Sequence, residues 1–170
     1  MADQEETVFL YVGTYADEKT ADSDYQLVKE LHKAKAVGSY DAVVVLRDVQ
    51  GNVHVNKDET AFRRGGWGGA AAGAVVGLIF PPAVLGAAAV GAAAGAVGGH
   101  LRRGLSRKDV DELGDLLALG EAGLVVVGRS KLADVLDHGR LNAARFVYKQ
   151  LGVDPKHIDD AVREAVREMG

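Results

Sequence analysis

The sequence of 170 residues contains no cysteine, three prolines and one tryptophan. The absence of cysteine excludes disulfide bonds and thiol chemistry, and it is typical of proteins kept in the reducing cytoplasm. The first six residues are acidic and polar, without the basic start and apolar run of a signal peptide. We therefore expect a cytoplasmic location, either in solution or at the cytoplasmic face of the cell membrane.

Motifs for catalysis and for metal binding are also absent. Residues 66–71 match the loose pattern GxGxxG/A, but a dinucleotide site needs a strand before it and an acid about 20 residues later. The next acidic residue is Asp109. The five histidines are scattered, and the acidic residues at 17–24 fit a divalent ion or, more simply, the start of a helix. We expect no enzyme activity, no cofactor and no bound metal.

Charge is absent from residues 65–99, and this segment holds 11 of the 22 glycines of the chain. Glycines recur there at every fourth residue on either side of a proline pair. The first set is Gly69, Gly73 and Gly77, the turn is Pro81 and Pro82, and the second set is Gly91, Gly95 and Gly99. Glycine costs about 1 kcal/mol relative to alanine inside a helix, so such spacing is typical of helices whose backbones approach closely. The pattern predicts a helical hairpin, a glycine zipper.

Positive charge flanks this hairpin in a chain of formal net charge −4. Residues 63–108 carry 6 basic and no acidic residues, whereas residues 1–62 carry 6 basic against 12 acidic and residues 109–170 carry 8 against 12. Arginine and tryptophan at the ends of apolar helices are typical of contact with lipid headgroups. The predicted headgroup or interface residues are Arg63, Arg64, Trp67, His100, Arg102 and Arg103.

Outside the hairpin, apolar strands alternate with amphipathic helices. Strands are expected at 7–12, 42–49, 53–57 and 122–127, and helices at 21–36, 106–119, 131–151 and from Pro155 onward. Ser106 and Asp109 form a capping box for the helix after the hairpin. Without the hairpin the order is β-α-β-β-α-β, the split βαβ arrangement. We predict an α+β fold of the ferredoxin-like type, with an inserted glycine-zipper hairpin and extra C-terminal helices.

The predicted domain boundaries follow from this order. Residues 1–62 and 105–130 form the ferredoxin-like α+β domain, and residues 63–104 form the inserted apolar hairpin. Residues 131–170 form the C-terminal helices. Both ends of the hairpin return to one place in this arrangement, which an antiparallel helix pair allows.

Five segments carry a resemblance to a known family. They are 9–15 (FLYVGTY), 25–32, 38–42 (GSYDA), 63–82 (RRGGWGGAAAGAVVGLIFPP) and 99–100. They resemble a bacterial domain-of-unknown-function family whose members are often described as membrane or glycine-zipper proteins, and the similarity covers about residues 7–128. The resemblance implies membrane association and no established reaction.

The hairpin helices leave two main functional hypotheses open. Residues 66–80 and 83–99 would form helices about 22 and 25 Å long, shorter than the roughly 30 Å hydrocarbon core. The first hypothesis is a non-enzymatic homo-oligomer that associates with the cytoplasmic face of the membrane through the hairpin, with a stress-related role. The alternative is a large soluble homo-oligomer, a shell, ring or filament, in which hairpins pack against each other.

A third and weaker hypothesis is a ligand-binding or enzymatic module that uses a cleft of the sheet. In both main hypotheses the partner is another copy of the chain, and in the first also an anionic lipid membrane. Nucleic acid is not an expected partner, because the basic flanks are not interleaved with aromatic residues.

Overall fold

The structure is a computed structural model that describes residues 7–33, 40–56, 70–80, 92–118, 122–129 and 141–169. The strands are β1 (Val8–Tyr15), β2 (Tyr40–Arg47), β3 (Val53–Asn56), β4 (Ala122–Arg129) and β5 (Arg145–Gln150). The helices are α1 (Glu18–Lys33), α3 (Ala70–Ile79), α5 (Ala92–Leu101), α6 (Arg107–Ala118) and α8 (Pro155–Met169), with a 3-10 turn, η1 (Arg102–Gly104), between α5 and α6. The predicted α+β class is confirmed.

The strands form one antiparallel sheet in the order β3-β2-β4-β1-β5. β4 therefore lies between β1 and β2, which run parallel to each other, and β1 lies between β4 and β5. The register places Val125 of β4 opposite both Val12 of β1 and Val43 of β2, and Val12 opposite Val147 of β5. This row of valines crosses four strands and forms an apolar floor on one face of the sheet.

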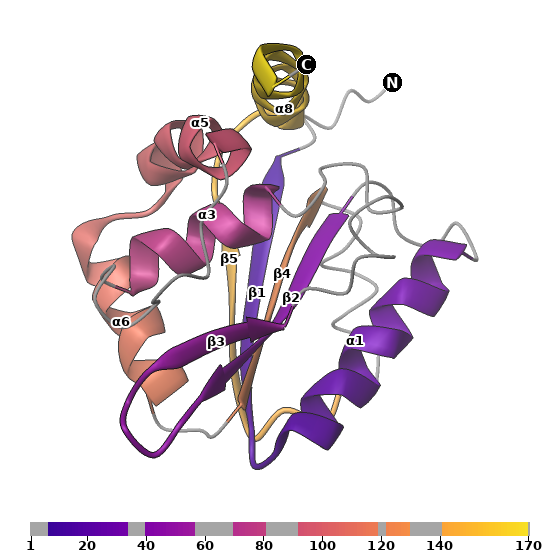
Figure 1. Cartoon of the computed structure of the whole chain (residues 1–170), viewed down its shortest axis with the longest axis vertical. Coiled ribbons are helices and arrows are strands. Elements are labelled where there is room, and N and C mark those ends of the chain that lie inside the picture. Colours follow the sequence, from indigo (N-terminus) through magenta and orange to yellow (C-terminus); the bar gives the residue numbers. More distant parts are fainter. Residues whose placement is uncertain are drawn as a thin grey trace.

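Helices cover both faces of the central strands (Figure 1). α1 lies on one face, and α3 and α6 lie on the other. All residues of β4 are buried except Arg129, which is half-buried. Burial on both faces explains why β2 and β4 are continuous apolar runs instead of alternating patterns.

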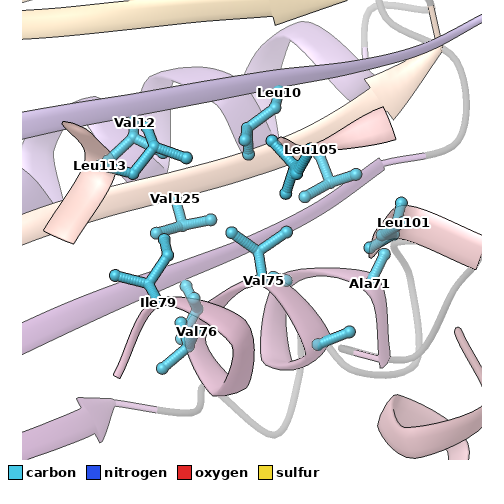
Figure 2. Packing of buried hydrophobic residues seen from close by; sticks show 14 of the residues in the cluster. Leu10, Val12, Ala71, Val75, Val76, Ile79, Leu101, Leu105, Leu113 and Val125 are labelled. Carbon is cyan, nitrogen blue, oxygen red and sulfur yellow. The ribbon is translucent and has the colours of Figure 1, made fainter. Parts of the chain in front are cut away.

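The helices of the predicted hairpin belong to the main core of the chain. Figure 2 shows Val75 and Ile79 of α3 facing Val125 of the sheet, and Ala71 at the start of α3 beside Leu101 of α5. α5 packs on the other side of α3 and against α8. Among the described residues, no helix combines the length and the apolar character that a membrane crossing requires.

The prediction of a helix over 131–151 is wrong for residues 145–150, which form the edge strand β5. The segment RFVYKQ alternates with a period of two, because Phe146 and Tyr148 contact the rings of β1 on one face while Val147 packs into the core on the other. Aromatic and β-branched residues in this pattern favour a strand once a partner strand is present.

Of the two roles considered for the acidic residues at 17–24, a divalent ion site or the start of a helix, Asp17 has the second. Asp17 precedes the helix, and its Oδ1 accepts hydrogen bonds from the backbone N–H and the hydroxyl of Thr20, both at 2.7 Å. This is an N-cap, and it places the start of α1 at Glu18, three residues before the predicted start.

The capping box predicted for α6 is confirmed. Ser106 N–H donates to Asp109 Oδ2 (2.9 Å), and Asp109 N–H donates to Ser106 Oγ (3.1 Å). The other carboxylate oxygen of Asp109 accepts a hydrogen bond from Lys149 Nζ of β5 at 2.6 Å. The bond from Lys149, followed by those from Ser106, lowers the pKa of Asp109 to about 2. One carboxylate thus starts α6 and ties it to the edge strand.

A glycine is required where η1 meets the segment between β5 and α8. A Cβ atom at Gly104 would run into the backbone carbonyl oxygen of Leu151. Gly99 in α5 is the opposite case, because a Cβ atom there would meet nothing within 4 Å. Close backbone approach therefore occurs at the end of the hairpin segment and not along the exposed side of α5.

Replacing Gly104 by alanine should lower the free energy of unfolding by about 1–3 kcal/mol, the usual cost of overpacking against a backbone that cannot yield. Gly99→Ala is the matched control and should leave the stability unchanged or raise it by up to about 1 kcal/mol through helix propensity. Urea denaturation followed by circular dichroism measures both. Equal stability of the two variants would show that the contact between Gly104 and Leu151 is not close.

The Asp109–Lys149 pair should make the stability fall in acid. The pKa of Asp109 lies below its ordinary value of 3.8, so the pair stabilises the folded chain above about pH 4, and this contribution is lost as the pH falls toward about 2. Both side chains are partly solvated, at 25% and 22% exposure, so we expect about 1 kcal/mol. Lys149→Met should remove much of this acid dependence in denaturation curves. A pH profile identical to that of the unmodified chain would contradict the assignment.

Candidate functional site

A buried carboxylate fixes the start of α3. Asp41 of β2 is 4% exposed, and its Oδ2 accepts hydrogen bonds from the backbone N–H groups of Ala71 (2.7 Å) and Ala72 (3.3 Å). The first N–H groups of a helix have no partner within the helix, and the positive end of its dipole attracts an anion. Asp41 satisfies both requirements and holds the helix against β2. Sequence reasoning missed it, because the contact joins residues 30 positions apart.

The structure places the predicted zipper glycines in different surroundings. Gly73 and Gly77 are half-buried in α3, Gly95 belongs to α5, and Gly99 is exposed. The contact of α5 with α3 includes Gly98, where a Cβ atom would lie 3.8 Å from Cβ of Ala74. The remaining predicted residues, Gly69, Gly91, Pro81 and Pro82, lie outside the described residues.

Four exposed cations follow α5. Arg102 and Arg103 lie in η1, and Arg107 and Lys108 lie in the first turn of α6. We call these four residues the cation cluster. Within the described part of the chain, their side chains make no ion pair and no hydrogen bond, whereas Lys149 and Arg129 are paired with carboxylates. Arg63, Arg64 and Trp67, which were predicted to share this surface, lie outside the described residues.

Two histidines that are far apart in the sequence come together beside this cluster. His100 lies in the last turn of α5 and His157 in the first turn of α8, and their ring centroids are 5.7 Å apart with an angle of 36° between the planes. His54 contacts Asp48 instead (Nε2 to Oδ2, 2.9 Å). Over the described ranges, no group of three or more histidine, cysteine, aspartate or glutamate residues could hold a metal ion.

A buried polar network lies on the face of the sheet that α1 covers, and the sequence analysis did not predict it. Tyr11 and Tyr15 share a hydrogen bond of 3.0 Å, and the hydroxyl of Tyr15 donates to Asp24 Oδ2 at 2.7 Å. The backbone N–H and the side-chain amide of Asn142 donate to the same carboxylate. Burial is the largest cause that raises the pKa of both tyrosines. The network ties α1 to β1 and to the segment before β5, and every bond in it is internal.

The family described as "Protein of unknown function (DUF1269)" matches residues 66–166. The match covers more than half of the chain and includes α3, α5, the cation cluster, β4 and β5. The chain belongs to the DUF1269 family. The resemblance to a family of unknown function is thus confirmed. A search of curated proteins and a search of solved structures gave no match.

In this DUF1269 protein, changing Asp41 should loosen the start of α3. Asp41→Asn keeps an oxygen acceptor but loses the charge, and it should cost about 1 kcal/mol of unfolding free energy. Asp41→Leu leaves two buried N–H groups unsatisfied and should cost about 2–4 kcal/mol. Urea denaturation measures the cost, and hydrogen exchange at the amides of Ala71 and Ala72 shows where it arises.

The control for both variants is Asp22→Asn on the exposed side of α1, which should stay within about 0.5 kcal/mol of the unmodified chain. If both amides exchanged as slowly in Asp41→Leu as in the unmodified chain, the carboxylate would not be what holds the start of α3.

Proposed function

We propose that this protein is a non-enzymatic module that binds the cytoplasmic face of a membrane and associates with further copies of itself. The observation that carries the proposal is the cation cluster. Four exposed cations without described partners lie within seven positions of a chain whose net charge is −4. An anionic surface attracts the cation cluster and repels the acidic rest of the chain, so the protein would approach the surface with the cluster first.

The strength of this contact follows from ordinary membrane electrostatics. A lysine or arginine near an anionic leaflet contributes about 1 kcal/mol, and the attraction fades within the Debye length of about 8 Å at physiological salt. Four such residues give a reversible, salt-sensitive attachment. The predicted partners Arg63, Arg64 and Trp67 would add to the same surface.

The packing of α3 favours attachment to the membrane surface over insertion of the hairpin. Val75 and Ile79 are buried against Val12 and Val125 of the sheet. Moving α3 into lipid would transfer apolar surface from one apolar environment to another while exposing the valine row to water. Burial of apolar area contributes about 25 cal/mol per Å², so this exchange has a net cost.

The predicted order β-α-β-β-α-β took the strand at 53–57 as the third strand, which a split βαβ arrangement would place between β1 and β2; that prediction is wrong, because β4 lies there and β3 lies at the edge. We further propose that β2, β4, β1 and β5 form a ferredoxin-like split βαβ sheet, with β3 as an added edge strand. The support is the interleaving of the strands, in which β4 lies between β1 and β2 and β1 lies between β4 and β5. The segment with α3 and α5 is then an insertion before β4. A glycine-zipper contact between its helices is part of this proposal, and the approach of Gly98 to Ala74 supports it.

The alternative is a soluble homo-oligomer. It is favoured by Gly99, which is exposed in α5 and has open space around the position of a Cβ atom. A helix of a second copy could approach this side of α5 closely. In that case the cation cluster would contact the acidic surface of the neighbouring copy instead of lipid.

Removing the cation cluster should abolish binding to anionic vesicles. The variant carries Arg102→Gln, Arg103→Gln, Arg107→Gln and Lys108→Gln. Cosedimentation with vesicles of phosphatidylglycerol and phosphatidylcholine at low salt should show a loss of affinity on the order of 1000-fold, because each of the four cations contributes about 1 kcal/mol. Vesicles of phosphatidylcholine alone should bind neither protein.

The control changes the formal charge by the same amount elsewhere, through Lys19→Gln, Lys33→Gln, Arg145→Gln and Arg167→Gln, all at exposed positions. It should bind within about threefold of the unmodified chain. Equal losses in both variants would sink the membrane proposal. Light scattering on the same samples then tests the alternative, which requires a soluble multimer that the cluster variant dissociates.

A further inference from the structure

The contact between His100 and His157 joins α5 to α8 at the surface. His157 is exposed and His100 is half-buried, so both rings can be reached from solvent. The residues are 57 positions apart, and each lies in a terminal turn of its helix. Arg102 and Arg103 of the cation cluster follow His100 directly in the next turn of the chain.

The spacing of the rings suits one small anion. The ring centroids are 5.7 Å apart, which brings the edges of the two imidazoles close enough for one N–H of each to reach a different oxygen of one phosphate, at about 2.9 Å per hydrogen bond. A neutral imidazole has one N–H donor, and a protonated imidazole has two donors and a positive charge. Protonation therefore changes the pair from two neutral rings in contact into two adjacent cations, which an anion beside them would stabilise.

We propose that His100 and His157 form a proton-dependent clamp for a phosphate group, a monoester or a diester, with Arg102 and Arg103 adding positive charge beside it. This inference rests on the proposed function, because a lipid headgroup is one source of the phosphate. It also stands with free phosphate as the ligand. Histidine is the side chain whose charge ordinarily changes between pH 5 and 8, so the clamp strengthens membrane binding as the pH falls.

Both basic and acidic groups lie close to His100 and His157 in the sequence. Neither α3 nor α5 contains another titratable residue, and η1 contributes Arg102 and Arg103. In the first turns of α8 and just before it lie Asp154, Lys156, Asp159 and Asp160. Asp154 accepts the backbone N–H of Lys156 (2.9 Å), and Asp159 is paired with Arg129 (3.0 Å). The carboxylates in this turn attract cations, whereas the two arginines repel a further cation and attract an anion.

The first arm of the test uses the full chain and inorganic phosphate. Proton NMR of the histidine C2–H signals should show that phosphate raises the titration midpoint of two signals by about 0.5 pH units, since an anion stabilises the charged ring. The signal of His54 should not shift. In the variant with His100→Gln and His157→Gln, both responsive signals disappear and no other signal becomes responsive.

The second arm uses vesicles of phosphatidylglycerol and phosphatidylcholine at about pH 5.5 and about pH 8, on either side of the range where histidine gains its proton. The unmodified chain should bind about tenfold more tightly at the lower pH. The double variant should show at most about a twofold change and unaltered binding at pH 8. His54→Gln is the matched control and should behave like the unmodified chain, and thermal melts confirm that each variant folds.

The two experiments together distinguish free phosphate from a lipid headgroup as the ligand. They also test the histidine clamp separately from the proposed membrane binding. A phosphate response in solution without a pH effect on vesicles supports the clamp and identifies free phosphate as its ligand. A double variant that keeps the full pH effect, or signals that ignore phosphate, overturns the clamp. Loss of vesicle binding in the cation-cluster variant together with an unchanged pH effect in the double variant supports the proposed function while overturning the clamp.

Discussion

The docking of α3 on the sheet determines the arrangement of the other elements. Asp41 holds the first turn of the helix through two backbone N–H groups, and Val75 and Ile79 face Val125 of the valine row. Because α3 carries no charged residue, its opposite side also needs cover, and α5 provides it through Ala74 and Gly98. α8 then packs against α5, so each layer depends on the one beneath it.

The sequence analysis correctly required the apolar helices of the hairpin to be buried, but it did not consider every place where they could be buried. A helix that is apolar on all sides must be buried. Lipid and other copies of the chain were the two burial sites considered, and the face of the chain's own sheet was a third. Val12, Val43 and Val125 form that face from three strands that are distant in the sequence. No local pattern reveals that these strands align into one apolar floor of the right width for α3.

The parts of the fold that sequence predicted are those fixed by neighbours along the chain. The capping box of Ser106 and Asp109, the helix that begins at Pro155, and the strand at 53–57, which pairs with β2, all depend on contacts that are close along the chain. The parts that were missed depend on distant partners. β5 is a strand because β1 lies beside it, and the His100–His157 pair depends on two helices packing together. Period-two alternation of Phe146, Val147 and Tyr148 was the one local signal for β5, and it competed with a longer helical pattern around it.

The cation cluster has no ion-pair partner among the described residues, although an acidic residue follows it directly in the sequence. Asp109 comes directly after Lys108, yet one of its oxygens caps Ser106 and the other accepts Lys149. The carboxylate therefore starts α6 and holds β5, and it forms no ion pair with the cation cluster. Mutual repulsion of exposed cations lowers stability only slightly in water, but it persists until an anion from outside the chain approaches. The same contacts that build the fold thus leave four exposed cations without a partner among the described residues, and this is the basis for proposing an anionic partner.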